Sequence, residues 1–460
     1  MLREVSPQAF ADLVHPMDAP LFKGLTTTPE MRAIFQADGL VQAWLDVEAA
    51  LAEAQADVGM IPQEAAQAIR EKADVRLIDI ARVQAHGKET AHTLLGVLRE
   101  YRANLGDPHQ TWLHYGATTQ DILDSATMLT VARAHAEIER QLDALIALLL
   151  GMMRRHRDTL MVARSHGNHA LPFTFGLKVA GWLDEMDRNR DRWTGLKTRC
   201  LVGNLSGAIG TFAAWEDKGL EIQARACRIL GLGAPRTWWH AQRDRLAELL
   251  AGLSLIAGTS ARIAQEIYVS CMTEIGELAE AYTHGTVGSS TMPHKLNPIG
   301  SEWVRSLAAL VQGNAAVMAR LMTPLNERDG SVWRAEWVTV PETFCLAGAM
   351  LAQLTKVLSG LIVNETRMRA NLDMLKGVLL SERVMFVLAR TMPLGDAHEV
   401  IHDISLKALE EGRPMLDLLL ADPRVASVCD RAELEAALKP ENYTGLSGEI
   451  VDALAREIGA

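Results

Sequence analysis

The sequence predicts an all-helical protein with a long central bundle. Aromatic residues make up only 5% of the 460 residues, whereas Ala and Leu dominate, and this balance favours packed helices over β-sandwiches. Apolar residues recur at three- and four-residue steps, as at Leu40, Trp44 and Val47. The sequence contains neither an alternating strand–helix rhythm nor a glycine-rich phosphate-binding motif. These observations indicate helices packed on helices.

Breaks in the helical pattern divide the chain into three regions. Gly and Pro interrupt the pattern in the segment 101–112, and shorter helices with more prolines begin near Ser359. We therefore expect three helical domains, which cover residues 1–107, 108–358 and 359–460.

The central region contains unusually long periodic runs with few helix breakers. Helices of this length that stay apolar on several faces favour a large bundle that other subunits complete. The runs span residues 121–157, 171–198, 243–282 and 298–322.

Charge and composition exclude several classes of partner. The formal net charge of −11 argues against nucleic acid, because phosphate binding needs a basic surface. The longest apolar stretch, 144–153, is too short to span a bilayer, and the N-terminal segment lacks the apolar core of a secretory signal. The five cysteines are scattered and have no metal-ligand spacing. We expect a cytoplasmic protein with buried, reduced thiols and no membrane partner.

A polar segment between two long runs carries the strongest functional signal. Residues 285–302 read GTVGSSTMPHKLNPIGSE, and the Gly, Ser, Pro and Asn in it do not suit a helix interior. His294, Lys295 and Asn297 concentrate hydrogen-bond donors there, although an ordinary surface turn has a similar composition. The longer pattern GSSTMPHKLNP resembles the shared loop of the fumarase/aspartase superfamily.

Two further segments resemble the same superfamily in the same order. Residues 114–121 (HYGATTQD) resemble its first region, and residues 163–176 (ARSHGNHALPFTFG) resemble its second region. With the N-terminal segment 21–40, the resemblance covers essentially the whole chain. It implies an all-helical homotetramer that shares active sites between chains, and a small anionic dicarboxylate as the substrate. It implies no metal and no other cofactor.

The resemblance assigns roles to loop residues that suit removal of a carbon-bound proton beside a carboxylate. Ser289 matches the base, while Lys295 and Asn297 match ligands of the substrate carboxylate. A serine is a poor base unless nearby amides and a cation stabilise its oxyanion. We interpret Ser290 as a structural neighbour, and an ordinary exposed lysine is the alternative for Lys295.

The other candidate residues would hold the substrate. Thr118 and Thr119 match a Thr-Ser pair that binds a carboxylate at a helix N-terminus, although simple N-capping would also explain them. Arg328 is a candidate anchor for an anionic group. His92 lies where adenylosuccinate lyases carry T-x-H-D, with Thr93 in place of the Asp. It either lines the pocket or caps a helix.

His166 matches the histidine that protonates the leaving group, and Glu302 matches the glutamate that pairs with it. Such a pair raises the pKa of the imidazole and fixes its tautomer, as a general acid requires. A structural histidine is the alternative. Ser165 and Asn168 stand where Thr and Gln are usual, so the substrate-binding surface they contribute differs from the common pattern.

Two segments indicate the branch of the superfamily. Residues 238–248 and 326–342 resemble the 3-carboxymuconate cycloisomerase branch, and Trp337 lies near the position of a phosphate-binding arginine of adenylosuccinate lyases. His166, often absent from bacterial cycloisomerases, favours elimination of a heteroatom group. We expect a lyase that converts a substituted succinate to fumarate or a close relative, with a cycloisomerase as the alternative. Adenylosuccinate lyase and a non-catalytic crystallin-like protein are less favoured.

Overall fold

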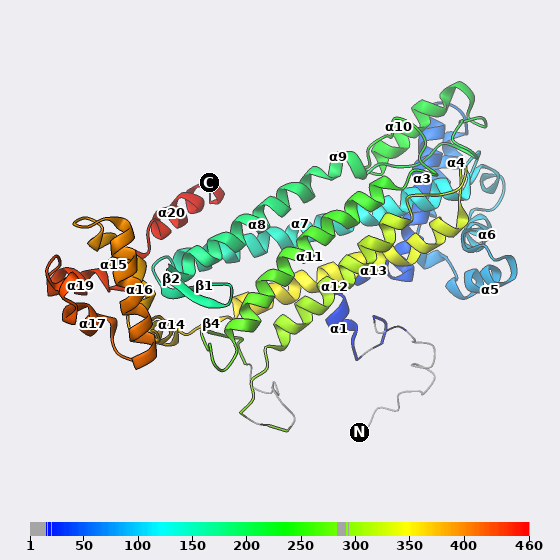
Figure 1. Cartoon of the computed structure of the whole chain (residues 1–460). Helices are drawn as coiled ribbons and strands as arrows, with labels where there is room; N and C mark the ends of the chain where they lie inside the picture. Colours follow the sequence, from blue (N-terminus) through cyan, green and yellow to red (C-terminus); the bar gives the residue numbers. More distant parts are fainter. Residues whose placement is uncertain (1–14, 16, 20, 283–290, 293, 460) are drawn as a thin grey trace. The chain divides into compact units, whose positions relative to one another are not determined.

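The computed structural model describes residues 15, 17–19, 21–282, 291–292 and 294–459, and helices predominate in it, as predicted (Figure 1). The chain forms two compact units, each built from three separated segments. The expected domain boundaries after residues 107 and 358 coincide with no boundary between these units, and the three-domain division stays a prediction. Unit 1 comprises Met1–Asp143, Asn189–Ser260 and Trp303–Ala352, and unit 2 comprises Ala144–Arg188, Ala261–Glu302 and Gln353–Ala460.

Among the described residues, five long helices begin in the sequence of one unit and end in that of the other. The longest has 37 residues, which corresponds to about 55 Å at 1.5 Å per residue. The five helices are α7 (Thr119–Arg155), α8 (Phe175–Gly195), α11 (Asp244–Ser270), α12 (Ile299–Arg320) and α13 (Gly330–Ser359).

Two of the predicted long helices are shorter than expected. The run that was expected to begin at residue 171 starts as a strand, and α8 begins only at Phe175, because the preceding segment pairs in a β-hairpin. The run expected to continue to residue 282 ends at Ser270, before a turn in which Gly276 has a φ of 62°. Glycine adopts this left-handed conformation readily, whereas a helix cannot continue through it.

Within unit 1, buried aromatic and polar contacts join four of the long helices. The His135 ring of α7 stacks on Trp193 of α8 at a centroid distance of 4.4 Å. Trp193 also lies 6.1 Å from the Phe344 ring of α13. The Asn189 side-chain amide donates to the Thr259 hydroxyl of α11 at 2.8 Å. The bundle therefore has a packed interior in this unit.

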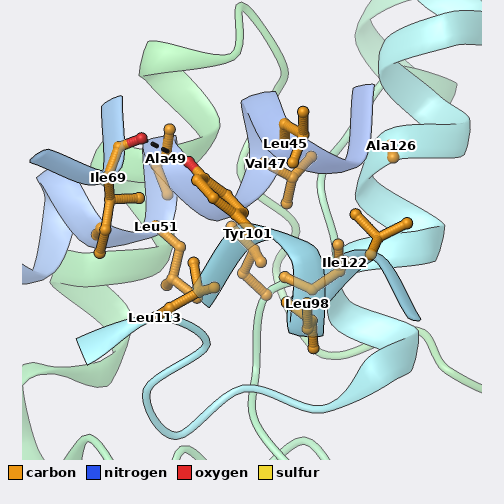
Figure 2. Close-up of a cluster of buried hydrophobic side chains, with 14 of the residues drawn as sticks. Leu45, Val47, Ala49, Leu51, Ile69, Leu98, Tyr101, Leu113, Ile122 and Ala126 are labelled. Atoms are coloured by element: carbon orange, nitrogen blue, oxygen red, sulfur yellow. Dashed lines mark hydrogen bonds between the residues drawn. The ribbon is translucent and has the colours of Figure 1, made fainter. Parts of the chain in front are cut away.

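The N-terminal helices of unit 1 surround an apolar core, part of which Figure 2 shows. Leu45 and Leu51 from α3, Ile69 from α4 and Leu98 from α6 are all buried. Tyr101 is also buried, and its hydroxyl donates to the Ile69 carbonyl, so the polar end of this ring is satisfied. The short helices are α1 (Lys23–Thr26), α2 (Pro29–Phe35), α3 (Ala37–Asp57), α4 (Gln63–Glu71), α5 (Ile80–Thr90), α6 (Thr93–Leu105), α9 (Lys197–Cys200) and α10 (Gly219–Ile229).

The C-terminal helices of unit 2 have a separate apolar core, formed in part by Val384, Leu388, Ile401 and Leu419. They are α14 (Glu365–Asp373), α15 (Ser381–Leu388), α16 (Leu394–Glu411), α17 (Met415–Ala421), α18 (Pro423–Ala426), α19 (Arg431–Ala437) and α20 (Ser447–Ile458). The strands that the structure describes form two antiparallel pairs, β1 (Leu160–Ser165) with β2 (Asn168–Thr174) and β3 (Leu278–Ala279) with β4 (Ile362–Val363). Short 3₁₀ turns span Val75–Leu77, His109–Trp112, Glu216–Lys218, Val378–Leu380 and Pro440–Tyr443.

In the part of the chain that the structure describes, one helix, α11, has the length and apolar composition of a membrane span. Half of its most apolar window is buried inside the protein, and a core helix meets the same criteria. Leu249, Leu253 and Ile256 of this helix are fully or almost fully buried. We therefore interpret α11 as a core helix of the bundle.

All five cysteines are free thiols, and four of them are buried, as expected. Burial raises the pKa of the Cys227 thiol to about 11. Thiolate is the reactive form, so this cysteine is a poor nucleophile near neutral pH.

Candidate active site

In unit 1, four predicted substrate-binding residues meet at the start of α7, which begins at Thr119. The Thr119 hydroxyl lies 3.2 Å from His92 Nε2, and the Thr118 hydroxyl lies 3.4 Å from Arg328 Nη1. A helix N-terminus carries partial positive charge and unpaired N–H groups, which attract a carboxylate. The cluster therefore combines hydroxyl donors, a cation and a helix end, and we call it the anion cluster.

His92 caps a helix, which is one of the two positions considered for it. It is the N-cap of α6, where its Nδ1 accepts a hydrogen bond from the Leu95 N–H at 3.3 Å. A neutral imidazole that accepts at Nδ1 carries its proton on Nε2, and here Nε2 faces the Thr119 hydroxyl. The helix cap thus fixes both the ring orientation and the tautomer that Thr119 meets.

Arg328 is held in place by two further hydrogen bonds. Its Nε donates to Gln120 Oε1 at 2.8 Å, and its Nη2 donates to the Ala208 carbonyl at 2.7 Å. These contacts leave Nη1 directed toward Thr118. The guanidinium is therefore oriented before any ligand arrives, which lowers the entropic cost of binding an anion.

Behind the anion cluster, the buried carboxylate of Asp121 fixes the backbone at the start of α7. Its oxygens accept from the backbone N–H groups of Ser206, Gly207 and Thr118 at 3.0, 2.9 and 3.1 Å. His240 Nε2 lies 3.1 Å from the same carboxylate. Because buried carboxylates require donors, this arrangement joins the 204–207 loop to Thr118 and limits their relative movement.

One turn further along α7, Asp124 forms a buried ion network with Arg243 and Glu336. Arg243 donates to Asp124 Oδ2 at 2.9 Å and to Glu336 Oε1 at 2.8 Å, and the Trp333 indole N–H donates to Asp124 Oδ1 at 3.0 Å. Burial alone would lower the pKa of Arg243, but the two carboxylates raise it above its ordinary value. Burial raises the pKa of Glu336 despite its pairing with Arg243.

Sequence reasoning did not assign roles to Asp121, Asp124, Arg243 or Glu336. The two aspartates occur three residues apart in an apolar helical run, which a pattern analysis reads as a solvated face. Arg243 and Glu336 lie in the segments that indicated the cycloisomerase branch. An acidic residue within an otherwise apolar helical stripe was the signal that could have predicted this buried network.

The segment before Thr118 is fixed by a second buried pair. His114 Nδ1 lies 2.6 Å from Glu48 Oε1, and the Tyr115 carbonyl accepts from the Gln55 amide at 2.8 Å. Burial alone would lower the pKa of His114, but Glu48 raises it above its ordinary value. Gly116 has a φ of 72°, and a Cβ there would lie 2.4 Å from the Trp215 indole nitrogen. The HYGATTQD motif therefore requires a glycine at this position.

In unit 2, the predicted acid His166 lies at the tip of the β1–β2 hairpin. Ser165 pairs with Asn168, so His166 and Gly167 form a two-residue turn. Their φ angles are 52° and 81°, and a type I′ turn requires positive φ at both positions. Ser165, His166 and Asn168 are all exposed. The hairpin thus presents the three predicted residues at one end.

Arg164 and Glu277 hold the base of this hairpin. The Arg164 guanidinium donates to the two carboxylate oxygens of Glu277 at 2.6 and 2.8 Å, and Glu277 is fully buried. Asn371 of α14 donates to the same carboxylate at 2.8 Å. The bidentate pair orients the hairpin through a planar contact that a lysine could not reproduce.

The described residues of the polar loop lead into α12. The Glu280 carboxylate accepts from the backbone N–H groups of Gly300 and Ser301 at 2.9 and 2.7 Å, which satisfies the N-terminus of α12. The Tyr282 hydroxyl donates to the Asn297 carbonyl at 2.9 Å. Lys295 is exposed, and Glu302 is exposed in the first turn of α12. Ser289 lies outside the described residues.

The structure therefore groups the predicted residues in two sets. Thr118, Thr119, His92 and Arg328 belong to unit 1, whereas Ser165, His166, Asn168, Lys295, Asn297 and Glu302 belong to unit 2. The pairing of His166 with Glu302, and the catalytic role of each residue, stay predictions. Within the described ranges, no group of three or more His, Cys, Asp or Glu side chains is placed to hold a metal ion.

Comparison with known proteins defines the class of enzyme. A family model described as lyase matches residues 24–313, and one described as the adenylosuccinate lyase C-terminus matches residues 377–454. An N-acetyl-S-(2-succino)cysteine lyase of Dickeya dadantii is 38% identical over 442 residues, which cover 96% of this chain and 97% of the relative. An adenylosuccinate lyase of Pyrococcus abyssi is also 38% identical, with coverage of 95% and 96%.

A solved structure extends the likeness to the three-dimensional fold. The 3-carboxy-cis,cis-muconate lactonizing enzyme from Pseudomonas putida matches with a TM-score of 0.90 at 33% identity, and the match covers 96% of this chain and 99% of that chain. The protein belongs to the fumarase/aspartase superfamily and is an enzyme of the lyase class, as the three motifs predicted.

Proposed function

We propose that this enzyme eliminates a heteroatom group from a substituted succinate and releases fumarate or a close relative. The observation that carries the proposal is the anion cluster, in which Thr118, Thr119 and Arg328 surround the N-terminus of α7. Such a group of donors suits a carboxylate. The Dickeya dadantii relative, named for a succinated cysteine, supports the same substrate class.

In the proposed reaction, the Ser289 alkoxide removes a proton from the carbon beside a carboxylate. Lys295, Asn297 and the threonine hydroxyls stabilise the negative charge that develops on that carboxylate. The bond to the heteroatom then breaks, its electrons leave with the heteroatom, and His166 supplies the proton that this group needs. Glu302 pairs with His166. The products are fumarate, or a close relative, and the protonated leaving group.

The test is turnover of a panel of S-, N- and O-substituted succinates, followed by the absorbance of fumarate. Ser289→Ala should lower kcat by several orders of magnitude with little change in substrate binding, because the base acts chiefly in the transition state. Ser290→Ala is the matched control and should retain most of the activity. Near-normal kcat in Ser289→Ala contradicts the assigned base.

Cycloisomerisation of 3-carboxy-cis,cis-muconate is the second candidate function, favoured by the Pseudomonas putida structure and by the segments 238–248 and 326–342. His166 distinguishes the two reactions. A basic heteroatom leaving group needs a positioned acid, which contributes about 10²- to 10⁴-fold in rate, whereas a carboxylate leaves without one. Efficient turnover of carboxymuconate together with no turnover of any succinate would establish the second candidate.

A further inference from the structure

A separate cavity of about 240 Å³ lies within unit 1, beside the anion cluster. It is formed by α3, α7 and α13, and Phe35 at the end of α2 and Thr93 at the start of α6 complete its wall. An apolar cavity of about 150 Å³ is large enough for benzene, so this one accommodates an aromatic ring with a short linker. The lining residues are Phe35, Leu40, Trp44, Thr93, Leu123, Asp124, Thr127, Thr130, Trp333, Glu336, Trp337, Val340 and Pro341.

Most of the residues that line the cavity are aromatic or aliphatic. The Trp333 and Trp337 rings meet edge to face at a centroid distance of 5.1 Å, and Trp44 faces the same space from α3. Pro341 lies inside α13, where its missing N–H interrupts the helical hydrogen bonds one turn after Trp337. Aromatic rings of this kind bind apolar and aromatic groups through large contact areas.

Several of the polar groups that line the cavity already have partners. The Thr127 hydroxyl donates to the Leu123 carbonyl at 2.8 Å, and the Thr130 hydroxyl donates to the Thr127 carbonyl at 2.8 Å. Asp124 is paired as part of the ion network with Arg243. A ligand in this cavity therefore gains by burying apolar surface and finds few open hydrogen-bonding groups.

The charges around the cavity exclude an anionic group. Among the described residues that line it, none is Arg, Lys or His, while Asp124 and Glu336 are acidic. A phosphate or carboxylate placed here would lose its hydration and meet like charge. Thr93, which replaces the Asp of the T-x-H-D motif of adenylosuccinate lyases, and Trp337, which lies near the position of their phosphate-binding arginine, both line the cavity.

The cavity and the anion cluster are linked through adjacent residues. His92, which contacts Thr119, directly precedes Thr93, and Leu123 lies four positions after Thr119 on α7, a rise of about 6 Å. We propose that the cavity receives an uncharged apolar or aromatic leaving group while the anion cluster holds a succinate carboxylate. This inference rests on the proposed lyase function and specifies its substrate class.

The test compares three thioethers of succinate that carry methyl, benzyl or carboxymethyl groups on sulfur, with the full-length enzyme. We expect kcat/KM for the benzyl compound to exceed that for each of the others by at least tenfold. Thr127→Phe fills the cavity and should remove this preference while it leaves turnover of the methyl compound. Val338→Ala is the matched control, since this exposed residue neighbours Trp337 without lining the cavity.

Trp337→Ala provides a second variant in case Thr127→Phe does not fold. It widens the cavity and should shift the preference from benzyl to naphthylmethyl thioethers. Equal kcat/KM for the methyl and benzyl compounds, unchanged in both variants, overturns the inference and leaves the lyase function standing.

A binding measurement separates the cavity from the reaction. Ligand-observed NMR with benzyl alcohol should show binding to the wild type and to Val338→Ala, and much weaker binding to Thr127→Phe. Benzoate, its anionic counterpart, should bind at least tenfold more weakly. No binding of benzyl alcohol to the wild type overturns the cavity's role irrespective of activity. Bound benzyl alcohol with no turnover of any S-, N- or O-substituted succinate overturns the lyase function instead, and the leaving-group role with it.

Discussion

Arg164 and Glu277 form a bidentate ion pair that joins β1 to the residue immediately before β3, and the Glu277 carboxylate is fully buried. A buried charge that loses its partner costs more free energy than an exposed one, because the remaining charge stays desolvated. The pair therefore determines how firmly the hairpin that carries His166 is held.

Glu277→Gln should lower the free energy of unfolding by about 3–5 kcal/mol, because it leaves Arg164 without its counter-charge. The measurement is the midpoint and slope of urea unfolding at neutral pH. Asp184→Asn is the matched control, because it breaks the exposed Arg188–Asp184 pair, which should contribute about 0–1 kcal/mol. Equal losses in the two variants would contradict the structural role of Glu277.

The His114–Glu48 pair predicts a specific pH dependence. The folded-state pKa of His114 is raised, so its protonated form adds stability that is fully present below the ordinary histidine value of about 6.5. This contribution is lost as the pH rises through the raised pKa. In the variants His114→Gln and Glu48→Gln, the free energy of unfolding should not fall over this pH range. The measurement is the free energy of unfolding as a function of pH. A wild-type profile in either variant would contradict the prediction.

The turn at His166 predicts which substitutions the hairpin tolerates. His166 has a φ of 52°, a conformation that Asn and Gly adopt readily and β-branched residues do not. His166→Asn should keep the unfolding midpoint of the wild type, whereas His166→Val should lose about 1–3 kcal/mol. Ser165→Val, at the neighbouring strand position, should change stability little. The prediction is wrong if Asn and Val behave alike in urea unfolding.

Two glycines of α12 should respond to alanine in opposite directions. A Cβ at Gly300 would lie 2.4 Å from Val357 Cγ2 and 2.9 Å from the Glu280 carboxylate, so Gly300→Ala should destabilise the protein. At Gly313 nothing lies within 4 Å, and Ala should stabilise the helix by about 0.5–1 kcal/mol. Thermal unfolding of the two variants checks the prediction, and a matching change in both contradicts it.

Assembly is predicted from the family resemblance and from the long helices. Sedimentation at micromolar concentration should give the mass of four 50.4 kDa chains. If active sites are shared between chains, inactive Ser289→Ala and His166→Ala enzymes should partly restore activity when their subunits are mixed. A monomer mass would contradict the tetramer, and the absence of rescue in mixed tetramers would contradict shared sites.

The periodicity of the sequence predicted the long helices well, because their apolar stripes depend only on local spacing. The helices α7 and α12 begin and end within two residues of the predicted runs. Periodicity failed for the segment 171–174, because the hairpin depends on the positive φ angles of His166 and Gly167. The spacing of apolar residues does not reveal such backbone angles.

The motifs named Thr118, Thr119, His92 and Arg328 as substrate-binding candidates, yet they did not predict what holds these residues together. The ion pair of Asp124 with Arg243 joins residues 119 positions apart in the sequence. Spacing rules compare only residues that are neighbours on one helix, so they predict that both charged side chains face solvent. The cavity beside Trp337 was not predicted for the same reason, since its lining residues come from α2, α3, α6, α7 and α13.

Because His166 and Gly167 form a two-residue turn, the number of residues in the hairpin is as important as their identity. Side chains alternate between the faces of a strand, so one inserted or deleted residue would reverse every side chain from the turn onward. The irregularity in pairing between Val162 and Arg164 already accommodates one extra residue on β2. Substitutions at the tip can therefore alter the chemistry of the hairpin, whereas its residue count stays fixed by the geometry of strand pairing.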